Sequence, residues 1–183
     1  MPAGRVTMDQ APIILTAMLG DADFRWADGL RRAHFPAARN QVPAHITLFH
    51  HLPPSVEAEL LGEMRRLGAA KAPFATLAGV RNLGRGVAYD VDSPGLLALR
   101  AAMADRFHGL LTPQDSVTRP RLHITVQNKV EPAAARTLSA ALSKDFRPRP
   151  LAIAGLAAWR YRGGPWEVIR TARFRGSGEA DFL

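Results

Sequence analysis

The chain has 183 residues, of which 47% are hydrophobic, so it has enough apolar residues for one domain with a sizeable core. Cysteine is absent, which excludes disulfide bonds and zinc–thiolate sites, and no apolar run is long enough for a transmembrane helix or a signal peptide. The formal net charge is +8 and comes mostly from arginine, which favours a polyanionic ligand such as a phosphate compound. A genome rich in arginine and alanine would explain the same charge.

Apolar periodicity and turn residues predict alternating strands and helices. The expected elements, in chain order, are a strand over 12–19, a helix over 21–34, a strand over 42–52, a helix capped by Ser55, a hairpin over 74–92, a helix over 96–110, a strand over 121–130, a helix beginning at Pro132 and a hairpin over 151–174. We expect residues 176–183 to form a flexible tail. The second half repeats the order of most of the first half, which indicates an internal duplication.

The duplication is clearest at two matching motifs, His45-Ile46-Thr47 and His123-Ile124-Thr125. Each motif lies on a predicted strand that is followed by a proline and a helix. Side chains alternate between the two faces of a strand, so the histidine and threonine of each motif share one face while the isoleucine points to the other. If the two halves of the chain face each other, two imidazoles and two hydroxyls meet in one cleft.

Such a set of groups suits the cleavage of a phosphodiester. The reaction needs a base to activate an attacking hydroxyl or water and an acid to protonate the leaving oxygen, and histidine can perform either role near neutral pH. Threonine hydroxyls can donate hydrogen bonds to the non-bridging phosphate oxygens, and neither a metal ion nor a cofactor is required. One such motif alone is usually a buried histidine with a hydrogen-bond partner, whereas two motifs in matched strands indicate function.

Paired His-x-Thr motifs in a duplicated α+β chain of this size resemble the 2H phosphoesterase superfamily, and most closely its 2′-5′ RNA ligase-like branch, also described as RNA 2′,3′-cyclic phosphodiesterases. The resemblance implies one domain over 1–183, built of two pseudo-symmetric lobes whose antiparallel β-sheets line a central cleft, with helices outside. The motif strands over 42–52 and 121–130 would face this cleft.

The resemblance also implies an activity. It predicts hydrolysis of 2′,3′-cyclic phosphates of RNA or nucleotides to a 2′-phosphomonoester, with 2′-5′ RNA ligation as a side activity. His45 and His123 would be catalytic, and Thr47 and Thr125 would bind the phosphate. By analogy one histidine activates water and the other protonates the ribose 3′-oxygen, with His123 favoured as the base.

The chain departs from the common pattern of this branch around the second motif. A proline often directly precedes the histidine there, whereas Arg121-Leu122 separates Pro120 from His123 in this chain. Residues Gln127-Asn128-Lys129 also replace an expected arginine-containing segment. These differences leave the histidine chemistry intact and the substrate open.

Three further residues are candidate substrate contacts. His51 is spaced evenly from His45, so it is expected on the same face of the strand, and Arg121 shares the face of His123. Tyr89 lies on a predicted hairpin and could stack on a nucleobase, although core packing is the more common explanation for an aromatic residue there. A metal site that includes His50 is an alternative, but it would lack a carboxylate ligand.

Two alternatives to the RNA cyclic phosphodiesterase stay open. One keeps the chemistry but takes a small nucleotide-sugar phosphate, and the other is a non-catalytic RNA-binding module, which the net charge of +8 would suit. In each case we expect a cytoplasmic monomer that binds no membrane and needs no obligate protein partner.

Overall fold

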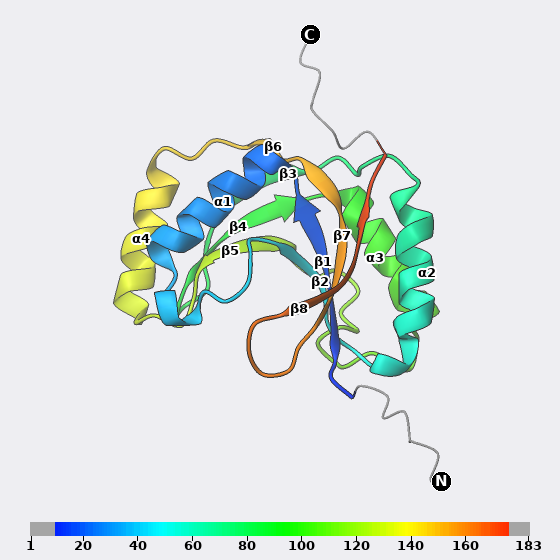
Figure 1. The fold of residues 1–183 in the computed structure, drawn as a ribbon. Coiled ribbons are helices and arrows are strands. Elements are labelled where there is room, and N and C mark those ends of the chain that lie inside the picture. The colour runs from blue at the N-terminus through cyan, green and yellow to red at the C-terminus, as the bar shows by residue number, and fades with distance from the viewer. Residues whose placement is uncertain (1–9, 176–183) are drawn as a thin grey trace.

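A computed structural model describes residues 10–175, which form two four-stranded antiparallel sheets and four α-helices (Figure 1). The strands are β1 (Ile13–Leu19), β2 (Ile46–Leu52), β3 (Thr76–Asn82), β4 (Val87–Asp92), β5 (His123–Gln127), β6 (Arg149–Pro150), β7 (Ile153–Arg160) and β8 (Glu167–Arg173). The helices are α1 (Asp21–His34), α2 (Glu57–Gly68), α3 (Pro94–Arg106) and α4 (Pro132–Lys144), with short 3₁₀ helices at Ala37–Arg39 and Pro54–Val56. The predicted α+β fold with two antiparallel sheets is confirmed. The predicted tail over 176–183 lies outside the described residues.

The two sheets have equivalent strand arrangements. Their strand orders are β2-β1-β7-β8 and β5-β4-β3-β6. Along the chain, β1, α1, β2, α2 and β3 are matched by β4, α3, β5, α4 and β7. The third strand of each series joins the sheet of the other series, because β3 pairs with β4 and β7 pairs with β1. Each half therefore completes the sheet of the other, and the motif strands β2 and β5 lie at equivalent sheet edges.

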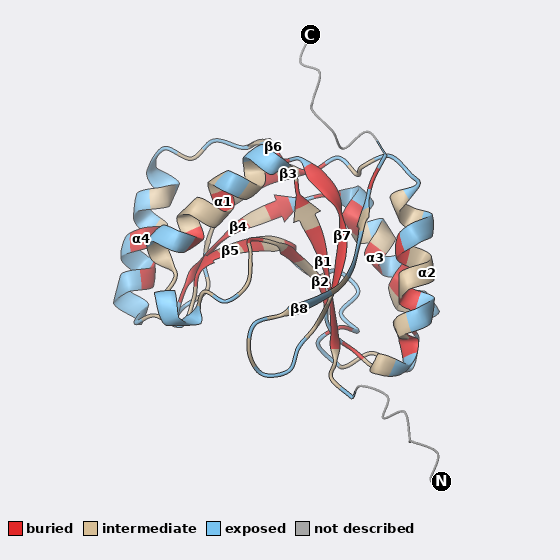
Figure 2. Cartoon of the chain, viewed as in Figure 1, coloured by how far each residue is buried: buried red, intermediate tan, exposed pale blue. Residues whose placement is uncertain are grey.

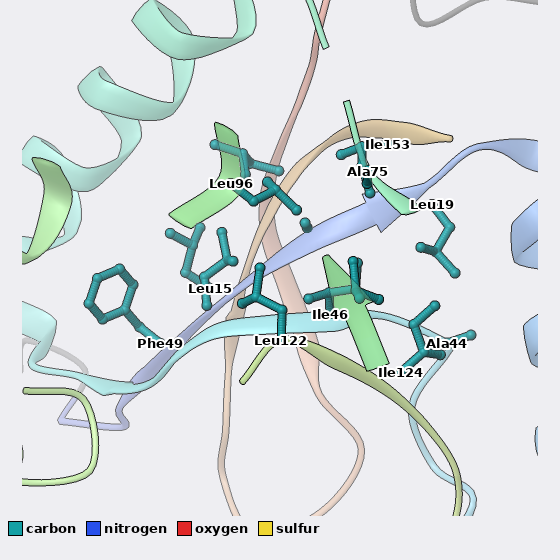
Figure 3. Packing of buried hydrophobic residues seen from close by; sticks show 14 of the residues in the cluster. Leu15, Leu19, Ala44, Ile46, Phe49, Ala75, Leu96, Leu122, Ile124 and Ile153 are labelled. Carbon is teal, nitrogen blue, oxygen red and sulfur yellow. The ribbon is translucent and has the colours of Figure 1, made fainter. Parts of the chain in front are cut away.

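The helices cover the outer faces of the two sheets. Helices α1 and α4 lie together over the sheet that contains β5, and α2 and α3 lie on the side of the other sheet (Figure 1). Buried residues follow most of the strands and the inward faces of the helices, whereas β8 is largely exposed (Figure 2). Apolar residues of both motif strands meet in one core, where Figure 3 shows Ile46 close to Leu122 and Ile124. Across residues 10–175, none of the helices is long and apolar enough to cross a membrane.

Several element boundaries differ from those predicted. Strand β2 begins at Ile46 instead of residue 42, and the short strand β6 was not predicted. Ser55 does not cap α2: it lies inside a 3₁₀ helix, and Val56 occupies the N-cap without a side-chain hydrogen bond. The consecutive prolines before Ser55 account for this, since they fix the backbone dihedrals and favour a tight first turn.

Candidate active site

The two motifs occupy matching positions in the two sheets. Ile46 and Ile124 are fully buried in the core, whereas the histidine and threonine of each motif are partly exposed. In the sheet register, Thr47 lies opposite Thr16 of β1, and His123 lies opposite Asp90 of β4. The polar residues of both motifs therefore lie on the faces of the sheets that the helices do not cover, as the alternation of strand side chains predicts.

Both motif histidines are oriented by the same local hydrogen bond. The Nδ1 atom of His45 lies 2.6 Å from the carbonyl oxygen of Pro43, and Nδ1 of His123 lies 2.8 Å from the carbonyl oxygen of Arg121. A carbonyl can only accept, so Nδ1 carries the hydrogen in each ring. The Nε2 atom of each ring is therefore left as the reactive nitrogen, which gains a proton as a base and gives one up as an acid.

The surroundings lower the pKa of both motif imidazoles. Burial lowers the pKa of His45 to about 4 against the opposing hydrogen bond to Pro43, and the positive charges of Arg31, His123 and His50 lower it further. Burial also lowers the pKa of His123, which the carbonyl of Arg121 opposes. Strands β2 and β5 contact each other between the two sheets, so the two motifs lie in the same region of the molecule.

Helix α1 holds the backbone of both motifs. Its Asp28 accepts a hydrogen bond from the backbone N–H of Ala44 at 3.2 Å, directly before His45. One turn later, Arg31 is only 2% exposed and donates from Nη1 to the carbonyl of Thr125 at 2.8 Å. A single rigid helix therefore fixes the two motif strands relative to each other.

Helix α3 repeats this arrangement from the other half of the molecule. Its Arg100 is 3% exposed and donates from Nε to the carbonyl of Leu48 on β2 at 2.9 Å. The same guanidinium donates to the carbonyls of Asp115 and Val117 at 2.6 and 2.9 Å. Sequence patterns had not indicated these two arginines, since an arginine on a helix is ordinarily a surface residue.

The surroundings of His45 are aromatic and apolar. The ring centroids of His45 and Trp166 are 4.8 Å apart, and Trp166 lies beside Trp159 with a centroid distance of 6.1 Å. A hollow of about 230 Å³ borders His45, and Met18, Phe24 and Trp159 contribute to its walls. These contacts account for the strong desolvation of the first motif histidine.

The surroundings of His123 are charged. Asp90 forms an ion pair with Arg81 (Nε–Oδ1, 2.9 Å) and a longer one with Arg121 (Nη2–Oδ2, 3.3 Å). The charge of Asp90 raises the pKa of His123, and that of Arg81 lowers it. Within residues 10–175, Arg81 Nη2 is buried without a hydrogen-bond partner, so Arg81 is a charged neighbour of the site that the sequence had not indicated.

The two other predicted substrate contacts, Tyr89 and Arg121, lie in different surroundings. Tyr89 is 5% exposed and packs against Trp26 and Phe146, with centroid distances of 4.9 and 5.7 Å, beneath α1 and α4. This placement on the helix-covered face argues against the predicted contact of Tyr89 with substrate, and shows that core packing explains this residue. Arg121 has a side chain that is 70% exposed, and its role as a substrate contact stays a prediction.

The face of His51 is not fixed by its spacing, because β2 contains bulges, and its contact with substrate stays a prediction. The pairing of β2 with β1 shifts twice between Thr47 and Leu52. As a result, two consecutive residues, Leu48 and Phe49, are buried, and the next two, His50 and His51, are exposed. A bulge breaks the strict alternation on which the even spacing of His51 relied. No group of three or more His, Asp or Glu residues in the described chain is placed to hold a metal ion.

Comparison with known proteins agrees with the motif and the topology. Residues 19–165 match the family described as the 2′-5′ RNA ligase superfamily. The chain belongs to this superfamily. Its match spans both motifs and confirms the resemblance that the paired histidines indicated. No curated protein sequence matches the chain significantly.

Two solved structures have a similar fold, and each aligns with almost the whole of this chain. TT0787 of Thermus thermophilus is 19% identical, with a TM-score of 0.56 over 90% of this chain and 98% of that chain. E. coli LigT complexed with 3′-AMP is 18% identical, with a TM-score of 0.51 over 91% of this chain and 99% of that chain. At these identities the likeness shows a common fold.

Proposed function

We propose that this member of the 2′-5′ RNA ligase superfamily hydrolyses 2′,3′-cyclic phosphates, on RNA ends or nucleotides, to 2′-phosphomonoesters. One observation carries the proposal: two imidazoles from equivalent sheet edges, next to strands that contact each other, have Nδ1 bound to a carbonyl and Nε2 left for chemistry. A pair of this kind can supply a base and an acid at the same time.

The reaction proceeds by exchange of one phosphorus–oxygen bond for another. One imidazole takes a proton from water as the water oxygen bonds to phosphorus. The bond from phosphorus to the ribose 3′-oxygen breaks, and the second imidazole delivers a proton to that oxygen. Thr47 and Thr125 donate hydrogen bonds to the non-bridging oxygens, whose negative charge grows in the transition state. The product is a 2′-phosphomonoester with a free 3′-hydroxyl.

The same steps account for 2′-5′ ligation as a side activity. If the 5′-hydroxyl of another RNA takes the place of water, the same proton transfers join it to the 2′-phosphate. The RNA substrate class is supported by the net charge of +8, and the similar LigT fold was solved with a nucleotide, 3′-AMP. The hollow beside His45 offers Trp159 as an aromatic wall against which a base could stack.

The decisive experiment is incubation of an RNA that ends in a 2′,3′-cyclic phosphate, with EDTA present, followed by mass spectrometry and phosphorus NMR of the product. We expect a 2′-phosphate from the wild type and a loss of about 10²–10⁴-fold in His45→Ala and in His123→Ala. Full activity in either variant would refute the paired mechanism.

Two comparisons distinguish hydrolysis of an RNA substrate from the two alternative functions. Turnover of an oligonucleotide and of a mononucleotide, each with the cyclic phosphate, measures the preference for RNA, and a large preference for the small compound would favour a nucleotide-derived substrate. RNA binding that survives loss of both histidines, without product from the wild type, would favour the binding module.

A further inference from the structure

Arg81 is a charged side chain that the paired-histidine mechanism does not use. It lies on β3, which is separated from the second motif strand β5 by β4. In the register of this sheet, Arg81 lies opposite Ala88, and Ala88 lies opposite Thr125. Side chains of directly opposite residues project from the same face of a sheet, so Arg81 lies on the face that carries Thr125.

The neighbouring row on the same face of the sheet contains His123. There His123 lies opposite Asp90, and Asp90 lies opposite Gly79. The Nε atom of Arg81 is 2.9 Å from Oδ1 of Asp90, so the guanidinium reaches from its own row to the row of His123. Directly opposite residues have Cα atoms about 4.5–5.5 Å apart, so the carboxylate of this ion pair belongs to an immediate neighbour of His123.

The guanidinium of Arg81 has hydrogen-bonding capacity that the protein does not use. Its Nε and Nη2 atoms are buried, and within residues 10–175 neither has a hydrogen-bond partner. The contact with Asp90 is therefore an ion pair that lacks the alignment of a hydrogen bond. Buried donors without partners are costly to the folded protein, whereas an anion beside the guanidinium would accept from them. The side chain is 20% exposed, so a ligand on this face of the sheet can reach it.

The surface beside this ion pair has room for an anion. Gly79 lies opposite Asp90 in the row that ends at His123. In the described part of the chain, a Cβ atom added at Gly79 would meet no atom within 4 Å apart from its own chain neighbours. The face of the sheet next to the carboxylate of Asp90 is therefore open at this position.

The equivalent position in the other sheet is occupied by an alanine. There Thr47 lies opposite Thr16, and Thr16 lies opposite Ala157. Because Thr47 corresponds to Thr125, Ala157 corresponds to Arg81. The backbone plan that the two halves share therefore does not require a cation at this place, and the arginine is a feature of the second motif.

We propose that Arg81 is a phosphate-binding residue, whose guanidinium donates to a non-bridging oxygen of the cyclic phosphate between the two motifs. The inference rests on the proposed function and adds a residue outside the His-x-Thr motifs. Arg81, Asp90 and Arg121 sum to one positive charge, which matches the single negative charge of a cyclic phosphodiester. The phosphate charge is therefore bound on the side of the second motif, and the nucleoside extends toward the hollow beside His45.

Two substitutions at Arg81 test the contact with an RNA that ends in a 2′,3′-cyclic phosphate. Arg81→Gln removes the charge, and Arg81→Lys keeps it as a compact ammonium without the planar fork. We expect kcat/KM to fall about 10–100-fold in Arg81→Gln and less in Arg81→Lys. Arg85→Gln is the matched control, because Arg85 lies in the turn of the same hairpin with a side chain that is 63% exposed. The proposal is overturned if Arg81→Gln stays within about twofold of the wild type, or if Arg85→Gln loses as much.

A second pair of variants separates phosphate binding from neutralisation of Asp90. If Arg81 serves only to balance this carboxylate, its loss should cost little once Asp90→Asn has removed the negative charge. If Arg81 binds phosphate, Arg81→Gln should still lose about tenfold or more in the Asp90→Asn background. Circular dichroism and thermal unfolding of all variants identify any loss of folding. Disappearance of the effect in that background would make Arg81 a structural partner of Asp90 and overturn the phosphate contact.

A binding measurement on the wild type distinguishes failure of this inference from failure of the proposed function. Inorganic phosphate, followed by NMR of the arginine Nε–H groups, should shift the signal of Arg81, and Arg81→Gln should bind phosphate about tenfold more weakly than Arg85→Gln. A shift at Arg81 without turnover of the RNA would defeat the proposed function and retain the anion site. A missing shift at Arg81 would overturn the phosphate contact, whether or not the wild type turns over the RNA.

Discussion

The two halves of this protein share a backbone plan but surround their histidines with different chemistry. His45 lies against Trp166 beside an apolar hollow, and burial brings its pKa to about 4. His123 lies opposite Asp90, which is paired with Arg81, and the charge of Asp90 counteracts part of the lowering of its pKa by burial. The shared backbone plan thus accounts for the two matched imidazoles, and the different neighbouring residues account for the different influences on their pKa values.

This difference bears directly on which histidine is the base. The symmetry of the two motifs leaves the roles open in the sequence, where we prefer His123 as base and His45 as acid. The pKa of about 4 makes His45 neutral at neutral pH, which is the state that a base requires. A bound phosphate is an anion and would favour the protonated form of both rings. The assignment therefore needs a substrate that separates the two roles.

The largest expected effect comes from a substrate with sulfur in place of the ribose 3′-oxygen. A thiolate leaves without a proton, so the variant that lacks the acid should recover much of the loss of about 10²–10⁴-fold, while the variant that lacks the base should not. Turnover of this substrate by His45→Ala and His123→Ala is the measurement.

The identity of the recovered variant then assigns the roles. Recovery of His45→Ala alone would support His123 as base, and recovery of His123→Ala alone would support the assignment that the pKa of His45 favours. Equal recovery of both variants, or of neither, would contradict the assignment of the acid role to one histidine and the base role to the other.

The second effect is on stability at acidic pH. The pKa of His45 is about 4 in the folded state against an ordinary 6.5, so the unfolded state binds more protons between these values and the stability falls as the pH falls. The contribution of His45 to this loss is up to about 3 kcal/mol. Urea unfolding of the wild type and of His45→Asn between about pH 7 and pH 4 measures it, and the variant should lose less stability on acidification.

Trp166→Ala tests the cause of that pKa. Without the indole, His45 is more exposed to water and its pKa should rise toward the ordinary value, as NMR titration of the ring would show. An unchanged pKa would mean that the desolvation of His45 comes from other neighbours.

The third effect concerns the two threonines. Replacement of either hydroxyl by the isosteric methyl in Thr47→Val or Thr125→Val removes a donor to phosphate and should reduce kcat/KM about tenfold. Steady-state kinetics measure the loss, and Thr137→Val, on the exposed surface of α4, is the control for the substitution itself. If only one of the two variants is impaired, the phosphate is held by one half of the molecule.

The smallest effect is expected at Arg121. Its side chain is 70% exposed and its bond to Asp90 is long, so Arg121→Gln should change KM by no more than about two- to threefold, since exposed ion pairs are weak. Kinetics at low and high salt measure this effect. A loss above tenfold would make Arg121 a direct phosphate ligand in place of a surface charge near the second motif.

Much of this architecture could be predicted from local patterns. The helix over 21–34, both hairpins and the helix that begins at Pro132 were found from apolar spacing, turn residues and the preference of proline for a first helical turn. The sides on which the motif residues point also followed from alternation along a strand. These features depend on residues that are close together in the sequence.

The remaining features depend on contacts between distant residues. Arg31 and Arg100 look like ordinary helix arginines until the fold brings each one beneath the opposite motif strand. The bulges that accompany two consecutive exposed residues, His50 and His51, are invisible in the spacing of β2, because they arise from the pairing with β1. The surroundings of Tyr89 also depend on distant residues, because its face of β4 is covered by helices.

The exchange of the strands β3 and β7 between the halves makes each half incomplete on its own. A polypeptide cut in the turn over 83–86 would yield an N-terminal piece that holds a strand for the other sheet and lacks β7 for its own. Either piece alone would leave edge backbone groups and apolar surface unsatisfied. Mixed together, the two pieces have every strand they need, so split chains of this protein should regain structure by reassociation.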